Sequence, residues 1–158
     1  MKNFSNDSSD FFTDSYYMGM ALAEARKAAD EDEVPIGAVI VTADGRIVGK
    51  GHNRTEALRD VTAHAEMMAL SAASAALGGK FLSNCTLYVT VEPCPMCAGA
   101  IGWARVGRVV IGTEDARRGF STILREGASP FHPRTEVVWG VCRDLCAEVI
   151  RDFFHQKR

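Results

Sequence analysis

The amino-acid sequence predicts an α/β fold, a three-layer α/β/α sandwich in which helices cover both faces of a central sheet. Two observations predict this fold: short runs rich in Val and Ile alternate with longer segments of helical periodicity, and no long linker interrupts them. Strands that alternate with helices are typical of this architecture. A chain of 158 residues can bury one hydrophobic core, so we expect a single domain over residues 15–158.

The first fifty residues are expected to form a tail, a helix and a hairpin. Residues 1–14 are rich in Ser, Asn and Asp, which is typical of a disordered tail. Helical periodicity begins at about Ser15. Two β-prone runs follow at 34–41 and 45–53, and the A-D-G sequence that joins them is a turn signal typical of a β-hairpin.

The rest of the chain alternates between helix and strand. A helix from about Ala63 to Leu77 is ended by two glycines. The β-prone run from Cys85 to Val91 has apolar residues on both faces, which is typical of a central strand covered on both sides. After it we expect a short helix, a buried strand, an irregular segment with a single turn, a fifth strand and an amphipathic C-terminal helix, at residues 92–104, 108–112, 113–134, 136–141 and 143–158.

The composition is that of an ordinary globular protein, with 47% apolar and 24% charged residues. No apolar run reaches membrane-spanning length and the polar N-terminal segment does not resemble a signal peptide, so we expect a cytoplasmic protein without a membrane partner. Five cysteines are an odd number, which favours metal binding or burial over a disulfide framework.

Charge is distributed unevenly along the chain, although the net charge is only −2. Residues 1–34 hold eight acidic and three basic residues, whereas residues 101–158 hold ten basic and seven acidic ones. The basic C-terminal third is compatible with an anionic partner, and a solvated charged face would show the same pattern.

Three residues with metal-binding side chains lie at two predicted helix starts. His64 lies in or next to the first turn of one helix, with Thr62 as its capping candidate. Cys94 can cap the next helix, and Cys97 projects from the same end of it. The partial positive charge at a helix N-terminus favours the thiolates that a metal binds. Three zinc ligands indicate a catalytic site, because a structural zinc site has four protein ligands.

Glu66 is the candidate proton carrier of such a site. A zinc-activated water needs a base that takes its proton and passes it on. Residues two apart do not share a helix flank, so Glu66 and His64 can reach one target only if both lean over the helix end. His-x-Glu followed by Pro-Cys-x-x-Cys is the signature of zinc-dependent deaminases. The alternatives are a structural zinc site and a metal-free core helix. The other cysteines are expected to be small buried residues: Cys85, Cys142 and Cys146.

Beyond this signature, the sequence from about Val34 to Arg158 resembles the bacterial tRNA-specific adenosine deaminases, which convert the wobble adenosine of a tRNA to inosine. The resemblance rests on the segments VPIGAVIV, GHNR, TAHAEMMAL, TLYVTVEPCPMCAGA, GRVVIG, EDARRG and DFFHQKR. It implies a cytidine deaminase-like fold with a mixed five-stranded sheet, a homodimer and a tRNA partner. It also implies a hydrolase in which one Zn²⁺ is bound by His64, Cys94 and Cys97 and in which Glu66 moves protons to adenine N1 and to the leaving ammonia.

The resemblance further implies four substrate contacts, each with an ordinary alternative. Asn53 would hydrogen-bond the purine ring, or be a turn residue. Ile36 would line the base pocket, or be a core residue of a strand. Asp115 would lie near the target ribose, or be a solvated acid of a loop. Phe154 would contact neighbouring bases, or be a core residue of an amphipathic helix.

Four basic residues would suit phosphate contacts, or be routine surface charges: Arg117, Arg118, Lys157 and Arg158.

A competing resemblance comes from GAIGWAR, because W-A-R follows the cysteine motif in bacterial guanine deaminases, whereas the adenosine deaminases more often have H-S-R there. The segments EDARRG and DFF favour the tRNA enzymes. Deamination of free guanine is therefore the alternative function, and cytosine or cytidine deamination is a third. A non-catalytic zinc-stabilised module is disfavoured by Glu66 and by the incomplete ligand set.

Overall fold

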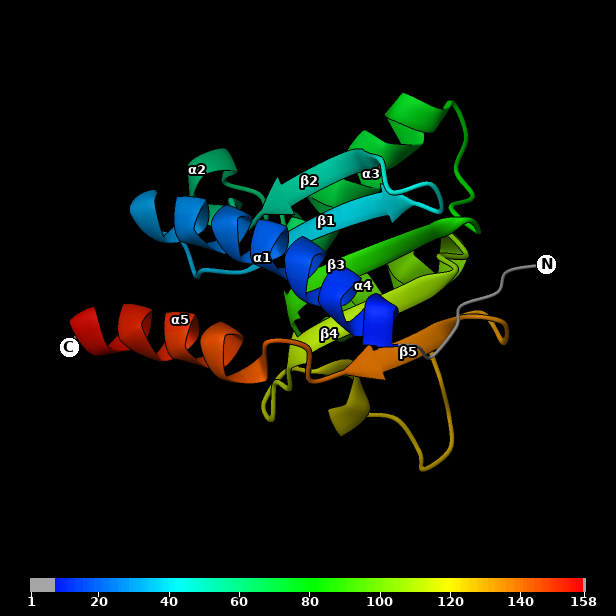
Figure 1. Cartoon of the computed structure of the whole chain (residues 1–158). Helices are drawn as coiled ribbons and strands as arrows, with labels where there is room; N and C mark the ends of the chain where they lie inside the picture. The colour runs from blue at the N-terminus through cyan, green and yellow to red at the C-terminus, as the bar shows by residue number, and fades with distance from the viewer. Residues whose placement is uncertain (1–7, 158) are drawn as a thin grey trace.

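The structure, a computed structural model, describes residues 8–157 and contains a five-stranded mixed sheet between two layers of helices (Figure 1). Helices α1 and α5 cover one face of the sheet, and α3 and α4 cover the other. The predicted three-layer sandwich is therefore confirmed. In chain order the elements are α1 (Ser8–Asp30), β1 (Gly37–Thr42), β2 (Ile47–His52), α2 (Thr55–Leu58), α3 (Ala65–Leu77), β3 (Cys85–Val91), α4 (Pro95–Trp103), β4 (Arg108–Thr113), the 3₁₀ turn η1 (Phe120–Thr122), β5 (Glu136–Trp139) and α5 (Arg143–Gln156).

The sheet brings four chain segments together at one edge. The strand order is β2-β1-β3-β4-β5, in which β1 is antiparallel to β2 and β3, whereas β3, β4 and β5 are parallel. The carboxyl ends of β2, β3 and β4 therefore lie at the same edge as the start of β1. Polar residues that follow these strands meet there, as they do in other open α/β sheets.

The core has two halves because successive side chains of a strand point to opposite faces of the sheet. Ala38 and Ile40 of β1 pack in the half beneath α3 and α4. Val39 and Val41 pack in the half beneath α1 and α5. β3, which was predicted to be a central strand covered on both sides, is buried along almost its whole length. Among the described residues, no helix is both long and apolar enough to cross a bilayer.

Helix α1 begins earlier than its periodicity predicted. It starts at Ser8 rather than near Ser15, so residues 8–14 of the expected tail are helical, and residues 1–7 lie outside the described part of the chain. Asp14 gives the physical reason. Its buried carboxylate accepts hydrogen bonds from both terminal nitrogens of Arg108, each at 2.7 Å, and from the Tyr88 hydroxyl at 2.8 Å. These three bonds hold α1 against the sheet at Asp14, so the helix extends at least one turn before Ser15.

Two short elements were not predicted, and one helix begins later than expected. Helix α2 depends on the buried Glu33, whose carboxylate accepts hydrogen bonds from two backbone amides of α2, each at 2.9 Å. Helix α3 begins at Ala65 with His64 as its N-cap, rather than near Ala63 with Thr62 as the cap. The Thr62 hydroxyl instead donates to Asp60. The 3₁₀ turn η1 lies in the segment predicted to be irregular.

Glycine in β2 allows α3 to approach the sheet closely. A Cβ at Gly51 would lie 2.3 Å from the carbonyl oxygen of Ala65, and one at Gly49 would lie 2.4 Å from that of Ala69. Contacts this short cannot exist, so any larger residue at Gly51 would push the first turn of α3 away from β2. The contact matters for the site because His64 immediately precedes that turn.

We expect Gly51→Ala to lower the free energy of unfolding by about 1–3 kcal/mol, the usual cost of overpacking a close-packed core. Urea unfolding followed by far-UV circular dichroism measures this change. Gly79→Ala is the matched control, because a Cβ at Gly79 meets nothing within 4 Å. Equal stabilities of the two variants would contradict the close packing of α3 on β2.

Candidate metal centre

The three predicted metal ligands come together at two adjacent helix N-termini. His64 is the N-cap of α3, with φ −79° and ψ 154°, so its backbone is extended rather than helical. Cys94 is the N-cap of α4, as predicted, and is followed by a proline at the first helical position. Cys97 lies one turn further along α4 and is fully buried. Both helices begin at the sheet edge where β3 ends.

The ligand atoms have the spacing of a tetrahedral zinc site. His64 Nδ1 lies 3.6 Å from Cys94 Sγ and 3.4 Å from Cys97 Sγ, and all three atoms lie within 4.8 Å of one another. Tetrahedral ligands at the usual Zn–N and Zn–S distances are about 3.5 Å apart. The donor set and its geometry therefore fit Zn²⁺.

The electrostatics of the cluster also suit a cation. A hydrogen bond from Cys97, together with one from His64, lowers the pKa of Cys94 to about 4. The same contact with Cys94, together with burial, raises the pKa of the Cys97 thiol. Contact with Cys94 raises the pKa of His64. The low pKa of Cys94 favours the thiolate form that a metal ion binds.

Glu66 lies in the first turn of α3, is only 3% exposed, and interacts electrostatically with Cys97. Burial raises the pKa of Glu66 to about 7, despite the opposing effect of its own backbone amide. The structure resolves the difficulty that residues two apart do not share a helix flank. His64 is not in the helix, so its ring and the Glu66 carboxyl can reach the same point beyond the helix end.

Asn53 and Ile36 lie at the same sheet edge. The backbone amide of Asn53 donates to the Ile36 carbonyl at 3.1 Å. The backbone amide of Arg54 donates to the carbonyl of Ala63, which precedes the ligand His64. The Asn53 side-chain nitrogen donates to the Val34 carbonyl at 3.3 Å, and its side-chain oxygen accepts a hydrogen bond from the backbone amide of Thr55. Ile36 is partly buried against the core half beneath α3 and α4. Asn53 thus makes the local hydrogen bonds of a turn residue, whereas Ile36 lies just before β1 and is only partly buried.

Asp115 lies close to the cysteine motif along the same edge. Its backbone amide donates to Glu92 at 3.1 Å, and its carboxylate accepts the backbone amides of Arg117 and Arg118, each at 3.0 Å. These bonds form the single turn predicted for EDARRG. The four basic residues considered for phosphate contacts are exposed where the structure describes them, and Arg158 lies outside that range.

Phe154 is not a core residue, because it is 49% exposed near the end of α5. Its ring packs edge-on against Phe153. Helix α5 covers the face of the sheet opposite α3 and α4 (Figure 1). Phe154 therefore does not lie beside the metal ligands in the way that Asn53 does.

Sequence reasoning missed one buried residue of this region, Glu92. It is 4% exposed, follows β3, and its carboxylate accepts three hydrogen bonds from the loop after β4. The signal that could have found it is an acidic residue at the end of an otherwise apolar strand, directly before a metal-binding motif.

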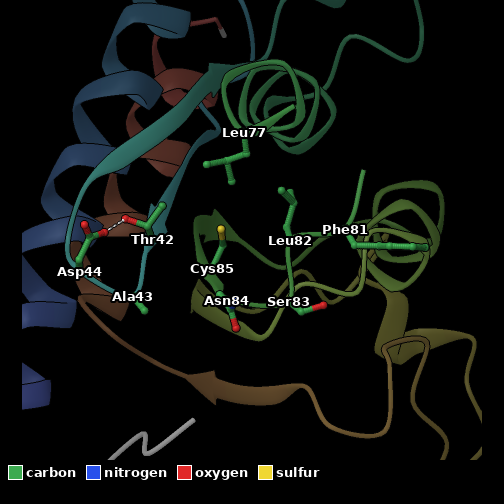
Figure 2. Close-up of a pocket in the computed structure, with 9 residues that line it drawn as sticks. All are labelled: Thr42, Ala43, Asp44, Leu77, Phe81, Leu82, Ser83, Asn84 and Cys85. Carbon is green, nitrogen blue, oxygen red and sulfur yellow. Dashed lines mark hydrogen bonds between the residues drawn. The ribbon is translucent and has the colours of Figure 1, made fainter. Parts of the chain in front are cut away.

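A cavity of about 570 Å³ lies at the opposite end of the sheet (Figure 2). It is lined by the end of α3, the loop after it and the turn after β1, and Cys85 is its buried thiol. None of the metal ligands lines it. Cys85 and Cys146 are buried as predicted, whereas Cys142 is only partly buried and precedes α5 in a left-handed conformation, with φ 54°.

Comparison with known proteins supports the same assignment. Residues 12–113 match the family model for the zinc-binding region of cytidine and deoxycytidylate deaminases. The chain is 44% identical over 146 residues to a tRNA-specific adenosine deaminase of Agrobacterium fabrum, a match that covers 91% of this chain and 95% of that protein. It is also similar, with a TM-score of 0.78 and 42% identity, to a structure from work on A-to-I editing by tRNA:A34 deaminases at the wobble position of transfer RNA; the match covers 85% of this chain and 99% of that one.

A guanine deaminase from Bacillus subtilis is similar as well, but less so. It is 36% identical with a TM-score of 0.61, and the match covers 74% of each chain. The match with this guanine enzyme thus has a lower sequence identity than the match with the tRNA enzyme, and both enzymes share the fold of this chain.

Proposed function

This chain belongs to the cytidine and deoxycytidylate deaminase family, and we propose that it hydrolyses adenosine to inosine at the wobble position of a tRNA anticodon. The observation that carries the proposal is the combination of a His-Cys-Cys-Glu site with near full-length similarity to tRNA-specific adenosine deaminases. The reaction consumes one water and releases one ammonia for each adenosine.

His64, Cys94 and Cys97 would hold the zinc and leave one position open to solvent. A zinc ion bound there would lower the pKa of a water molecule so that it could attack C6 of adenine. Glu66 would take the first proton of that water and deliver it to N1, and would then move the proton of the new C6 hydroxyl group to the departing amine, which leaves as ammonia. Because its pKa is about 7, Glu66 can both accept and donate a proton near neutral pH, as general acid–base catalysis requires.

The adenine would bind at the sheet edge beside these residues. We assign the side-chain amide of Asn53 to hydrogen bonding with the purine ring and Ile36 to the apolar wall of the pocket. Asp115, which lies along the same edge, would face the ribose of the target nucleotide. Phe154, exposed on α5, would stack on bases that flank the target, since exposed aromatic side chains are the usual platforms for unpaired RNA bases.

The W-A-R sequence bears less on the choice of base than the sequence alone suggested. Trp103 is the last residue of α4, and Cys94 is the cap at the other end. Nine residues of helix separate them by about 13 Å, and the Trp103 side chain is 85% exposed. Within one chain, this motif is therefore remote from the base pocket, and the guanine reaction remains the second candidate on overall similarity alone.

A side-by-side assay distinguishes the candidates. We expect inosine formation on an anticodon stem-loop RNA, with little ammonia release from free guanine or cytidine. The RNA assay should weaken steeply with salt, because phosphate contacts release counterions. Rapid ammonia release from guanine without inosine in the RNA would replace the proposal with the nucleobase reaction.

We also propose that the protein forms a homodimer through α3 and α4. From Met67 to the end of α3, and along the whole of α4, the sequence has no charged residue, although several of these side chains face solvent. Trp103 and Val61 are 85% and 82% exposed beside this uncharged surface. Depletion of charged residues together with an exposed aromatic residue is typical of an interface core. Pairing of identical faces in a dimer is the commonest way to bury such a surface.

A tRNA substrate also supports a cytoplasmic location.

We expect Trp103→Asp to convert the dimer to a monomer, because it replaces an exposed aromatic at the end of α4 with a charge beside the uncharged surface. Size-exclusion chromatography with light scattering measures the change. Tyr16→Asp is the matched control, since Tyr16 is an exposed aromatic on α1, which covers the other face of the sheet. If Trp103→Asp keeps the mass of the unchanged protein, this interface is wrong.

A further inference from the structure

We propose that Glu92 is a positioning residue. It holds the loop after β4, residues 114–121, against the segment that carries Cys94, so that the two arginines of this loop face the RNA. The inference rests on the proposed function, because it concerns the binding of the same substrate. Glu92 lies two residues before Cys94 and does not reach into the metal cluster. Its role is to connect that cluster to a loop that carries two exposed arginines.

The Glu92 carboxylate fastens both ends of the loop. Oε1 accepts the backbone amide of Asp115 at 3.1 Å. Oε2 accepts the backbone amide of Ser121 at 2.9 Å and its hydroxyl at 2.7 Å. The neighbouring backbone adds two bonds, from Glu92 N to the Thr113 carbonyl at 2.8 Å and from Phe120 N to the Pro93 carbonyl at 2.9 Å. One buried side chain thus determines where the loop leaves the sheet edge and where it returns.

The loop packs closely against the Glu92 carboxylate. A Cβ at Gly119 would lie 2.2 Å from the Glu92 carboxylate, so the loop backbone crosses directly over it. Phe120 is buried and packs edge-on against Phe131, with ring centroids 5.1 Å apart. The carboxylate and the Phe120 ring together hold the returning end of the loop in place.

The loop presents two cations to solvent. Arg117 and Arg118 are exposed, and their backbone amides are bound by the Asp115 carboxylate. That carboxylate stabilises the turn, and the turn is held beside the cysteine motif by Glu92. The guanidinium groups are therefore carried by a turn that hydrogen bonds hold beside the cysteine motif. A pair of arginines on such a turn suits the phosphates that flank a nucleotide inserted into the site.

The test is Glu92→Gln, which keeps the size of the side chain. An amide has one acceptor and one donor end, so one of the two loop ends must face an NH₂ group and is released. We expect RNA binding to weaken roughly tenfold and the slope of log affinity against log salt to fall by about 1–2, the effect of losing one or two phosphate contacts. KM for the stem-loop should rise by a similar factor, with kcat changed much less and one zinc per chain retained.

A double-mutant cycle separates positioning from general destabilisation. Arg117→Ala with Arg118→Ala should weaken binding in the unchanged protein but add little in the Glu92→Gln background. Asp14→Asn is the matched control, because Asp14 is an equally buried carboxylate with three accepted hydrogen bonds, at the far end of the sheet. It should alter stability and leave the salt slope unchanged.

Ser121→Ala tests the proposal even if Glu92→Gln does not fold. It removes the hydroxyl donor at 2.7 Å from the carboxylate and should shift the salt slope in the same direction by a smaller amount. Full additivity in the cycle, or an unchanged salt slope in both variants while the unchanged protein makes inosine, would overturn the proposal. Absence of inosine with the unchanged protein would instead remove the proposed function.

Discussion

Replacing Glu66 with glutamine is expected to lower kcat for inosine formation by about 10²- to 10⁴-fold, the usual contribution of a general acid–base group. Glutamine keeps the size of the side chain but cannot take a proton from water or deliver one to adenine. Glu66 is not one of the three ligands, so zinc content should remain at one per chain. Single-turnover kinetics on a stem-loop RNA and metal analysis of the same sample measure both quantities.

Glu56→Gln is the control for the loss of a negative charge near the site. Glu56 belongs to α2 and is exposed, so its replacement should change kcat by less than about twofold, as expected of a surface substitution away from the chemistry. If Glu66→Gln kept full activity, the proton carrier would have to be another group. If it lost zinc as well as activity, Glu66 would be supporting the metal site rather than moving protons.

Replacing Cys97 with alanine is expected to weaken zinc binding by more than about 100-fold. Loss of a residue that only hydrogen-bonds to a metal ligand costs about 10- to 100-fold in affinity, and loss of the ligand itself should cost more. Cys97 is fully buried in α4, so a solvent-exposed side chain is not expected to take its place. Activity should be lost with the metal. Competition with a chromophoric zinc chelator, followed by the assay on RNA, measures both effects.

The stability of the unchanged protein should respond to chelation in the same direction. A metal that binds only the folded state stabilises it by about 4 kcal/mol when its free concentration is 1,000 times its Kd. Chelation should therefore lower the Tm of the unchanged protein and leave the Tm of Cys97→Ala almost unchanged. Cys146→Ala is the matched control, since Cys146 is just as buried but packs between α5 and the sheet. Loss of zinc from this variant would contradict the assignment of the ligands.

Much of the fold follows from short-range pattern. The β-prone runs of β1, β3 and β4 and the glycines that end α3 each express a preference of a few neighbouring residues. Their type was therefore predicted correctly. The start of α1 was not, because Asp14 is held by Arg108, which lies 94 residues away in the chain. No local signal distinguishes a buried acid with such a partner from a polar residue of a tail.

The candidate ligands could also be named from the sequence. His64, Cys94 and Cys97 have the residue types and helix-end positions that zinc requires, and Glu66 has the chemistry of a proton carrier. The structure brings the three ligand atoms to within 4.8 Å of one another. It also shows how His64 and Glu66 converge, since His64 caps α3 instead of entering it.

The remaining features depend on contacts between distant parts of the chain. Glu92 accepts bonds from residues 23 and 29 positions away, and the uncharged surface exists only because α3 and α4 lie side by side on one face of the sheet. The residue types at helix ends and the periodicity of apolar residues act over a few neighbouring residues and can be recognised from the sequence. A buried carboxylate, a close glycine contact and a shared surface become visible only when the folded chain brings their partners together.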